Sequence, residues 1–479
     1  MSQPAHSALI DGQWQAGEGA WRAVHNPVTG EVIAQVADAS AEQVAAAARA
    51  AERAFASWRH SSASERSHWL GRIADGIEAE RTRLQALQQR NNGKPTFEAA
   101  LDVSDAVATF RYYADLCARG EGMTARDVPL PDDSVQAELQ PLPVGVVALI
   151  VPWNFPMVTT AWKLAPALAA GCTVVLKPSE LTPLAEIALQ DIITATGLPA
   201  GVVNLVCGAG EVGQALLAHP AIAKISFTGS NATGQRILAA AGPRLQRVSL
   251  ELGGKSSLIV LDDASLAQAI ELAVGGAFFN AGQMCSATSR VLVARSLWDR
   301  FIDGFVAAAQ AQRHGPAAAN DTTLGPLISA RQRDGVLARI QNGIGRGARL
   351  LTGGQALAGE GGFAMAPTVL TDATHSPALW DEEIFGPVAC LQPIDSDAEA
   401  IQIANRSDYG LVATVVGGER ERARRVAAEL NVGTVWLNTP QLIFPHTAWG
   451  GFKHSGLGRE LGPWGLKAFQ EIRHLIHAR

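Results

Sequence analysis

Between residues 144 and 261 the chain repeats one pattern, in which a short apolar run is followed by a stretch with helical character. The apolar runs cover residues 144–151, 173–176, 202–207, 222–227, 247–250 and 257–261. The helical stretches that lie between most of them cover residues 159–170, 184–196, 212–219 and 233–241. This alternation is typical of βαβ units and predicts a buried parallel sheet covered by helices. A second series of α/β segments, from about 264 to 440, predicts a second domain of the same class.

The N-terminal part of the chain is predicted to form short strands followed by helices. Residues 9–37 alternate apolar and polar side chains, which is typical of strands and turns. Ser40, with Gln43 three residues later, has the signature of a capping box and predicts a helix that continues to about Trp58. Two more helices are predicted near residues 64–91 and 96–119.

Three other segments complete the predicted organisation. Gly93-Lys94-Pro95 is expected to break the two helices that flank it. Residues 125–143 are polar and contain proline, which predicts an extended connection or a strand pair. The tail, from residue 462 onward, is expected to end in another strand.

Length and composition narrow the class of protein. A chain of 479 residues exceeds one hydrophobic core, so two or three domains are expected. A net charge of −6 without a basic block argues against nucleic-acid binding, and the longest apolar run is too short to span a bilayer. The N-terminus has no charged leader followed by an apolar core, so no export signal is expected. We therefore expect a cytoplasmic protein without nucleic-acid or membrane partners.

The five cysteines argue against a disulfide framework. They are odd in number, widely spaced and without a C-x-x-C motif, and they lie at positions Cys117, Cys172, Cys207, Cys285 and Cys390. This spacing predicts a reducing compartment and no structural metal site.

Cys285 is the cysteine with the most informative surroundings. It lies in Phe279-Asn280-Ala281-Gly282-Gln283-Met284-Cys285-Ser286, and Glu251 precedes it by 34 residues. A thiol and a carboxylate of this kind are the components of covalent acyl chemistry. A single cysteine is more often a small buried apolar residue, so the neighbouring motifs must decide between the two interpretations.

Two turns are candidates for binding a dinucleotide. Gly208-Ala209-Gly210-Glu211-Val212-Gly213 matches G-x-G-x-x-G between a strand and a helix, but the acidic residue expected about 20 positions later is missing. The next strand–turn–helix contains Gly229 and Ser230, and its helix offers free N–H groups to a pyrophosphate. An ordinary capped helix start is the alternative for this second turn.

Other polar residues follow the predicted strands at their carboxyl ends. Lys177-Pro178-Ser179-Glu180 lies where open α/β sheets bind ligands, and Glu180 would repel a 2′-phosphate, which favours NAD over NADP. Asn154, in a turn bounded by prolines, carries an amide of the type that serves in oxyanion holes. For each of these residues a solvated or structural role remains the alternative.

Taken together, the motifs resemble those of the NAD(P)-dependent aldehyde dehydrogenase superfamily, over essentially the whole chain. Six motifs occur in the family's order: Pro152-Trp153-Asn154-Phe155-Pro156, Lys177-Pro178-Ser179-Glu180, Phe227-Thr228-Gly229-Ser230, Glu251-Leu252-Gly253-Gly254-Lys255, Gly282-Gln283-Met284-Cys285 and Glu382-Glu383-Ile384-Phe385-Gly386-Pro387. The resemblance implies a catalytic role for Cys285 as the thiolate that attacks the aldehyde. It implies that Asn154 and the Cys285 N–H hold the oxyanion, and that Glu251 activates water to hydrolyse a thioester.

The resemblance also implies supporting residues and a domain plan. Lys163 and Glu460 would relay protons behind Glu251, with a structural ion pair as the alternative for Glu460. The cofactor would be NAD, bound by Trp153, Lys177, Ser179, Glu180, Gly210, Gly229, Ser230, Thr233, Leu252, Glu383 and Phe385. The implied fold is α/β, with an NAD-binding domain (residues 1–121 and 144–253), a catalytic domain (254–454) and a small β oligomerisation arm with the C-terminal segment (122–143 and 455–479). Family members are dimers or tetramers, so a homo-oligomer is expected.

Within the family, the segments around Cys285 and Trp449 resemble the betaine aldehyde and aminoaldehyde branch. The resemblance implies a substrate channel lined by Asp102, Asp105, Phe155, Trp162, Phe279 and Trp449. Asp102 and Asp105 are three residues apart on a predicted helix and therefore share a face. Phe155, Leu101 and Phe279 depart from the aromatic residues usual in this branch, so an aromatic cage for trimethylammonium is incomplete.

An ω-amino- or guanidino-aldehyde is therefore the expected substrate. A neutral aliphatic or aromatic aldehyde, or a semialdehyde, is the first alternative. A CoA-acylating enzyme is disfavoured because such relatives typically lack the glutamate at Glu251. A non-catalytic NAD-binding relative is disfavoured because Cys285, Glu251 and Asn154 are all present.

Overall fold

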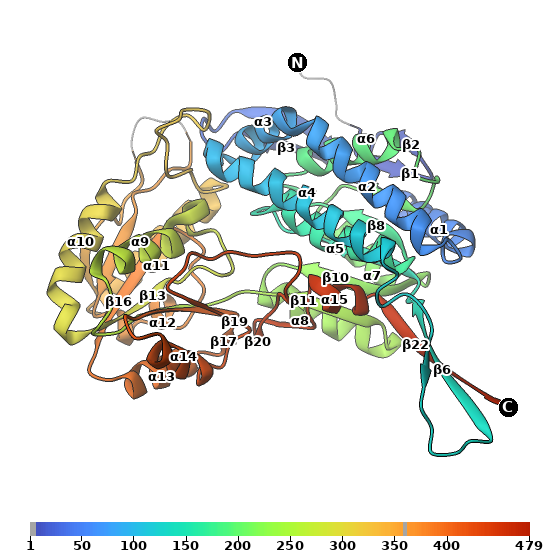
Figure 1. Ribbon diagram of the computed structural model, residues 1–479. Helices are drawn as coiled ribbons and strands as arrows, with labels where there is room; N and C mark the ends of the chain where they lie inside the picture. The colour runs from blue at the N-terminus through green and yellow to red at the C-terminus, as the bar shows by residue number, and fades with distance from the viewer. Residues whose placement is uncertain (1–5, 358–361) are drawn as a thin grey trace.

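The computed structural model describes residues 6–357 and 362–479 and contains two large sheets and a projecting arm (Figure 1). The first sheet has eight strands, in the order β2 (Gln13–Gln15), β1 (Ala8–Ile10), β9 (Val203–Val206), β8 (Thr173–Lys177), β7 (Val146–Ile150), β10 (Ile222–Thr228), β11 (Arg247–Glu251) and β21 (Gly456–Leu457). The five central strands, β9 to β11, are parallel, and antiparallel strands flank them on both sides. The parallel sheet expected from the alternating pattern is therefore confirmed.

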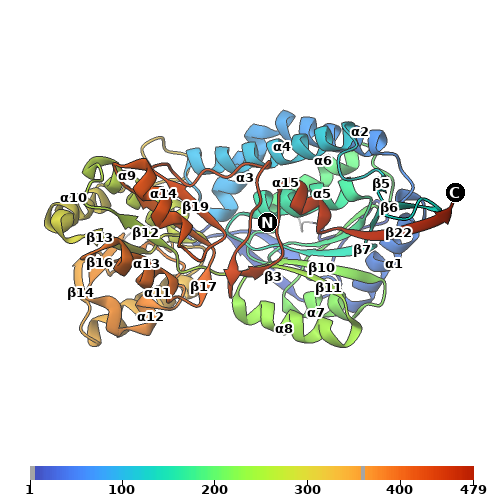
Figure 2. The same cartoon turned by 60° about the horizontal axis from the view of Figure 1, so that its bottom comes forward.

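Helices cover both faces of this sheet (Figure 2). They are α1 (Ala41–Trp58), α2 (Ala63–Ala79), α3 (Arg81–Asn92), α4 (Thr96–Ala118), α5 (Pro156–Ala170), α6 (Leu184–Ala195), α7 (Gly210–Ala218) and α8 (Asn231–Ala241). Successive strand residues point to opposite faces, so Val147 and Leu149 join one core while Val146 and Ala148 join the other. Such two-sided burial explains the continuous apolar runs in the sequence.

The helical predictions need one change. The capping box of Ser40 and Gln43 is present at the start of α1. The single helix predicted near 64–91 is wrong, because α2 ends at Ala79 and α3 begins at Arg81. Between them Glu80 has φ −97° and ψ 12°, which interrupts the helical backbone.

The second sheet has seven strands and forms the other half of the molecule. Their order is β14 (Arg349–Thr352), β15 (Thr368–Thr371), β16 (Val388–Ile394), β13 (Arg290–Ala294), β12 (Ser257–Val260), β18 (Val412–Val416) and β19 (Thr434–Leu437). All pairs are parallel except β14 with β15. The helices of this half are α9 (Leu266–Phe278), α10 (Trp298–Gln310), α11 (Ala330–Gly345), α12 (Pro377–Trp380), α13 (Asp397–Asn405) and α14 (Arg420–Ala428).

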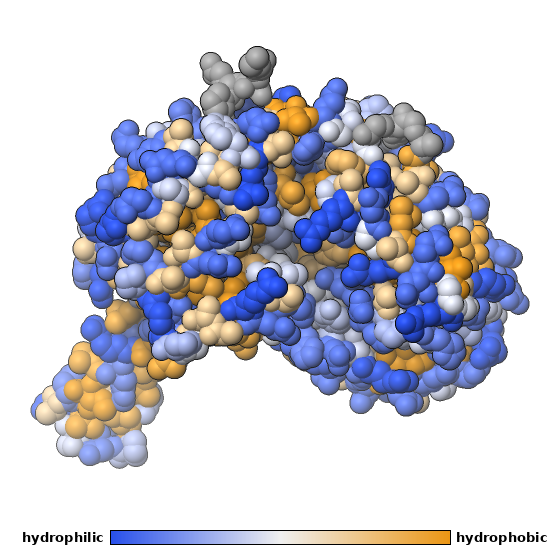
Figure 3. All heavy atoms as spheres, turned by 180° about the vertical axis from the view of Figure 1, so that it is seen from behind, coloured by the Kyte–Doolittle hydropathy of each residue, from blue (hydrophilic) through white to orange (hydrophobic). Residues whose placement is uncertain are grey.

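A three-stranded arm extends from the first half. It consists of β5 (Arg126–Val128), β6 (Val135–Pro143) and β22 (Gln470–Ala478), and β22 pairs with β6 along all of its nine residues. Apolar surface is exposed on the arm (Figure 3). Ile472 and Ile476, on β22, are among its exposed residues. Two small sheets, β3 (Trp21–His25) with β4 (Val32–Ala37) and β17 (Tyr409–Gly410) with β20 (Phe452–Lys453), complete the strands.

The C-terminal segment does more than build the arm. Residues 455–479 also contribute β21, which pairs with the end of β11 at Glu251, and α15 (Gly462–Lys467), which packs on α5. The C-terminal segment therefore contributes to the first sheet as well as to the arm. Its return across the first sheet brings Glu460 to the interior.

In the described ranges no helix is both long and apolar enough to cross a bilayer.

Candidate active site

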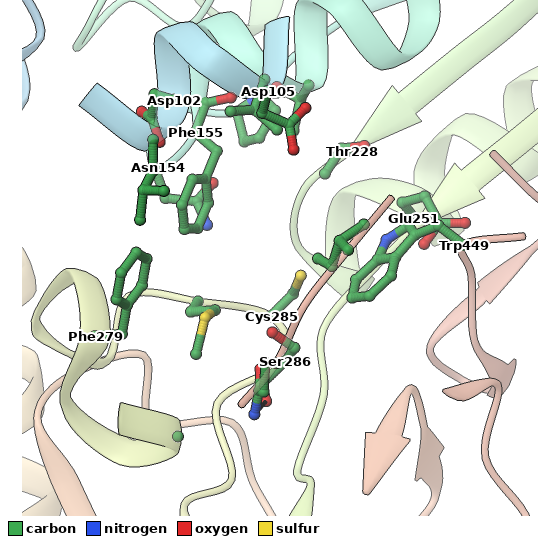
Figure 4. A pocket seen from close by; sticks show the side chains of 18 of the residues that line it. Asp102, Asp105, Asn154, Phe155, Thr228, Glu251, Phe279, Cys285, Ser286 and Trp449 are labelled. Atoms are coloured by element: carbon green, nitrogen blue, oxygen red, sulfur yellow. Dashed lines mark hydrogen bonds between the residues drawn. The ribbon is translucent and has the colours of Figure 1, made fainter. Parts of the chain in front are cut away.

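One cavity of about 940 Å³ brings together the residues expected to carry the chemistry (Figure 4). Cys285 lies in the loop before β13, Glu251 is the last residue of β11, and Asn154 lies in the turn between β7 and α5. The side chains of these three residues therefore reach the same cavity from both halves of the molecule. The strand-end positions follow from the rule that open α/β sheets bind ligands at their carboxyl edges.

The loop that carries Cys285 has an unusual backbone. After α9 a short 3₁₀ segment, Phe279–Gly282, contains Asn280 and Ala281 with φ of 50° and 53°, and Gly282 follows with φ 67°. A left-handed conformation is unfavourable for residues with a side chain and persists only where the surroundings enforce it. A side chain at Gly282 would also lie 2.1 Å from the Gly386 carbonyl oxygen, so glycine is required there.

Hydrogen bonds hold this loop in place. The Asn280 N–H donates to the buried Glu98 carboxylate at 2.8 Å. The Gln283 side chain donates to the carbonyl oxygens of Asn280 and Pro326 and accepts the N–H of Ile328. The position of the neighbouring thiol is thus set before any substrate arrives.

The Asn154 amide lies directly against this loop. Its Nδ2 donates to the Gln283 carbonyl oxygen at 2.9 Å, and the Asn154 carbonyl oxygen accepts from Asn280 Nδ2 at 3.1 Å. An amide nitrogen carries two hydrogens, so one remains for an oxyanion in the cavity. The geometry suits the role expected from the motif.

The Cys285 thiol is not a preformed thiolate. Burial raises its pKa well above the usual range, and the nearby Glu383 and Glu251 carboxylates raise it further. The backbone N–H groups of Ser286 and Cys285 act in the opposite direction with a smaller effect. The expectation of an attacking thiolate therefore requires a base that removes this proton during the reaction.

Glu251 lies in surroundings that favour the protonated form of its carboxyl group. Burial raises its pKa well above the usual range, and the neighbouring Glu460 carboxylate adds to this effect, while Lys163 and Arg459 oppose it. Its Oε2 atom is buried and has no hydrogen-bond partner in the described part of the chain. Such an atom is suited to a water molecule or a substrate-derived group.

Glu460 and Lys163 form a buried ion pair beside Glu251. Lys163 Nζ donates to Glu460 Oε1, although the residues are 297 positions apart. The Glu460 backbone is fixed by paired hydrogen bonds with Trp449. Glu460 is thus in an ion pair and also lines the cavity, so the structural interpretation and the relay interpretation both fit the geometry.

One end of the cavity carries residues expected to bind the nicotinamide half of the cofactor. The Trp153 and Phe385 rings meet edge-on at 5.2 Å, and Glu383 Oε1 accepts the Gly254 N–H at 3.1 Å. Gly229, Ser230 and Leu252 line the same end. Burial raises the pKa of Glu383 to about 7.

The N-terminus of α8 also reaches this end, where Ser230 caps the helix by accepting the N–H of Thr233. A helix start beside a cavity is a favourable place for an anionic pyrophosphate.

The remaining predicted cofactor residues do not line this cavity. Lys177 Nζ donates to the carbonyl oxygens of Pro178 and Gly208, so the Lys177–Glu180 turn is held against the Gly208–Gly213 turn. Ser179, Gly210 and Thr233 likewise lie outside the cavity lining. The structure therefore brings the two turns together at the carboxyl edge of the first sheet, away from Cys285.

The other end of the cavity is aromatic. Phe155 and Phe279 stack at 6.4 Å with an interplanar angle of 8°, and Trp162 meets Trp449 at 5.6 Å. Asp105 accepts a hydrogen bond from Trp162 Nε1 at 2.7 Å. Burial raises the pKa of Asp105 to about 6.

Asp102 differs from the expectation of a free acid at the channel mouth. Its side chain is 2% exposed and forms an ion pair with Lys94, and it also accepts a hydrogen bond from Gln88. The packing of the turn at Lys94 against α4 buries both partners. The Asp102 carboxylate reaches the cavity lining but is already neutralised by Lys94.

Several cavity residues were not singled out from the sequence. Thr228, Glu271, Gly275 and Gln441 received no role. Lys94, which contacts the Phe155 ring from outside the lining, is expected from the sequence only as part of a helix break. Helical spacing from the Phe279 motif back to Gly275 and Glu271 is the signal that points to two of them.

Comparisons with known proteins identify the family of the chain. The aldehyde dehydrogenase family model matches residues 14–475. A chloroplastic aminoaldehyde dehydrogenase of Arabidopsis thaliana is 41% identical, covering 99% of this chain and 96% of the relative. Betaine aldehyde dehydrogenase 1 of Oryza sativa subsp. japonica is 40% identical, covering 98% and 95%.

Solved structures give the same result. A point mutant of betaine aldehyde dehydrogenase from Staphylococcus aureus, in complex with NAD+, superposes with a TM-score of 0.96 at 36% identity, covering 99% of this chain and 96% of that chain. The NAD+ complex of an aldehyde dehydrogenase from Bacillus cereus gives 0.96 at 38% identity, covering 99% and 97%.

Proposed function

Since the chain belongs to the aldehyde dehydrogenase family, we propose that it oxidises an aldehyde to the carboxylic acid through a thioester on Cys285, with NAD as cofactor. The observation that carries this proposal is the shared cavity. It joins Cys285, Glu251 and Asn154 to the residues expected to bind nicotinamide.

In the first step, the Cys285 sulfur forms a bond to the aldehyde carbon. Its thiol proton must leave and passes to solvent in the cavity, because the surroundings of Glu251 favour the protonated form of its own carboxyl group. The carbonyl oxygen becomes an oxyanion, which the free Asn154 N–H and the Cys285 backbone N–H stabilise. The hydride of this tetrahedral adduct then departs, and the thioester remains on Cys285.

Bound NAD supplies the acceptor for that hydride. Trp153, Glu383 and Phe385 would hold its nicotinamide half in the cavity, and the N-terminus of α8 would bind its pyrophosphate. The turn before α8 requires glycine at Gly229 for packing, because a side chain there would lie 2.5 Å from the Phe227 ring.

In the second step, Glu251 gives its own proton to the Lys163–Glu460 pair and then takes a proton from water as the oxygen attacks the thioester carbon. The carbon–sulfur bond breaks, the carboxylic acid leaves and the Cys285 sulfur is restored. The Lys163–Glu460 pair beside Glu251 would pass the proton onward. A glutamate in this position supports hydrolysis over transfer to coenzyme A.

We propose a preference for NAD over NADP. Glu180 follows β8 at the carboxyl edge of the first sheet, next to the Gly208–Gly213 turn. Its carboxylate would accept hydrogen bonds from ribose hydroxyls and repel a 2′-phosphate. Replacing Glu180 with glutamine is expected to raise kcat/KM for NADP relative to NAD.

An ω-amino- or guanidino-aldehyde is the proposed substrate. Asp105 offers a carboxylate inside the aromatic end of the cavity. A trimethylammonium group needs open aromatic faces, and Phe155 already has Lys94 Nζ 3.8 Å from its ring centroid. The Lys94 charge therefore disfavours a quaternary ammonium at that ring and favours a cation farther from the thiol.

A neutral aldehyde is the second candidate, supported by the cavity rim. Leu101, Leu442 and Phe444 line the cavity and expose 54%, 52% and 52% of their surface. Apolar groups at an entrance favour an apolar substrate tail.

A substrate panel tests the proposed function. NADH formation is measured with 4-aminobutanal, 4-guanidinobutanal, betaine aldehyde, butanal and benzaldehyde, each with NAD and with NADP. The proposal expects acid and NADH in equal amounts, with the highest kcat/KM for the ω-amino- or guanidino-aldehyde. Acyl-CoA formation in the presence of coenzyme A, or no turnover of any aldehyde, would reject it.

Assembly and location are also proposals. The β22 strand lies at the edge of the arm sheet with exposed apolar residues, and such an edge can pair with another chain. We therefore expect a homo-oligomer. The five free cysteines in the described residues suit a reducing compartment, and the cytoplasm is the proposed location.

A further inference from the structure

Two glycines in the last turn of α9, Gly275 and Gly276, line the cavity. Glycine inside a helix is less favourable than alanine, so each needs a reason. Packing explains Gly276, because a Cβ there would lie 2.1 Å from Thr288 Oγ1. At Gly275 an added Cβ would meet no atom within 4 Å. Packing against neighbouring residues therefore does not explain the glycine at position 275, and its missing side chain leaves open space in the cavity.

Polar atoms without partners face the same region. Thr414, on β18, is 2% exposed, and its Oγ1 atom has no hydrogen-bond partner in the described ranges. Gln441 lies in the segment after β19, and its Nε2 donates to the Ser286 carbonyl oxygen at 3.1 Å, while its Oε1 has no described partner. Both residues line the cavity, so a lobe between α9, β18 and residues 439–442 begins next to Cys285.

A carboxylate marks the outer part of this lobe. Glu271 is four residues before Gly275 and therefore lies on the same face of α9. It lines the cavity and is exposed, and it has neither an ion pair nor a hydrogen bond within residues 6–357 and 362–479. All charged or polar groups of the lobe can accept hydrogen bonds, and its only formal charge is negative.

We propose that this lobe receives the tail of the aldehyde and that Glu271 binds an ammonium or guanidinium group at the end of that tail. The inference rests on the proposed function, because it assigns the far end of the same substrate. The absence of a side chain at Gly275 makes room for the methylene chain. Gln441 Oε1 and Thr414 Oγ1 can accept hydrogen bonds from any N–H group that the tail carries between the aldehyde and its end. A substrate too short to reach Glu271 gains no binding free energy from this carboxylate.

Two variants test the charge and the space separately. Glu271→Gln is expected to raise KM for 4-aminobutanal and 4-guanidinobutanal by about two- to fivefold, as for an exposed ion pair, and to leave hexanal unchanged. Gly275→Phe fills the lobe and is expected to raise KM for hexanal and both cationic aldehydes by roughly fourfold for each methylene excluded, and to leave propanal unchanged. Asp303→Asn, an exposed acid on α10 outside the cavity, is the matched control and should change none of these values.

Equal effects of Glu271→Gln on hexanal and on the cationic aldehydes would overturn the role of Glu271. If KM is unchanged for every long aldehyde in Gly275→Phe, the lobe does not receive the tail of the substrate. If Gly275→Phe does not fold, as judged by thermal melting, Gly275→Leu takes its place in the same comparison. If wild-type protein does not oxidise even propanal, the proposed function itself is wrong, and the proposal for the lobe falls with it.

Discussion

The ammonium group of Lys94 lies 3.8 Å from the centroid of the Phe155 ring and forms a buried ion pair with Asp102. One face of an aromatic ring at the substrate end of the cavity is thus occupied by a cation of the protein itself. The carboxylate that balances this cation is not free to bind a substrate. Of the two acids on α4, Asp105, three residues later, is the one that has no ion pair with Lys94.

Asp102→Asn is therefore expected to reduce stability more than it changes substrate preference. Removing one partner of a buried ion pair leaves the other charge uncompensated, which costs about 3–5 kcal/mol. Chemical denaturation measures the loss. Asp105→Asn is the matched variant, since it leaves the Lys94 pair intact. A selective rise in KM for cationic aldehydes in Asp102→Asn, with unchanged stability, would contradict this view of the pair.

The KM for cationic aldehydes should also depend on pH through Asp105. Burial raises the pKa of its carboxyl group to about 6, so it is charged at pH 7.5 and becomes neutral as the pH falls through about 6. We expect KM for 4-aminobutanal to rise below pH 6 while KM for butanal stays constant. Asp105→Asn should remove this difference, and a difference that persists in the variant would exclude Asp105 as its source.

The free enzyme should react slowly with alkylating agents at neutral pH. Burial, with the carboxylates of Glu383 and Glu251, raises the pKa of the Cys285 thiol well above its usual range. The rate of iodoacetamide labelling of Cys285 should therefore keep rising from pH 7 to pH 9.5 without a plateau. Peptide mass spectrometry identifies the site. A plateau below pH 8 would mean that the resting protein already holds a thiolate.

Glu186 gives a prediction for stability. It is buried in α6, and neither carboxylate oxygen has a partner among the residues described. Burial raises its pKa from 4.5 to about 8. In the unfolded chain the group ionises near 4.5, whereas the folded protein keeps the proton to about 8. Its contribution to stability is therefore complete below pH 4.5 and is lost as the pH rises to 8, at ~1.4 kcal/mol per unit of pKa difference.

Glu186→Gln removes this proton equilibrium. The melting temperature of the variant should exceed that of the wild type at pH 8 and differ little at pH 5. Thermal unfolding at the two pH values makes the comparison. An equal change at both would show that packing, and not ionisation, dominates at this position.

The sequence predicted the parts of the fold that depend on local pattern. The strands from Val146 to Glu251 were recognisable because burial on both faces requires continuous apolar runs. The Ser40 capping box was recognisable because its partners are three residues apart. Glu251 and Asn154 follow strands of the first sheet and so lie at its carboxyl edge, and the loop before β13 brings Cys285 to the same cavity from the other half.

Other features of the site depend on packing between distant segments. Lys94 and Asp102 form an ion pair only because the turn after α3 folds onto α4. No pattern in the sequence predicts this contact. Glu460 approaches Glu251 because β21 returns to the first sheet. The space at Gly275 depends on what surrounds α9, which periodicity does not reveal.

The central claim is a thioester on Cys285 that Glu251 hydrolyses. Glu251→Gln removes the base, so hydrolysis should slow by about 10²–10⁴-fold. The variant is mixed with NAD and 4-aminobutanal, and intact and peptide mass spectrometry is recorded over time. We predict that one acyl group accumulates on Cys285, with NADH formed in equal amount. An unmodified Cys285 with NADH formed at the wild-type rate would contradict it.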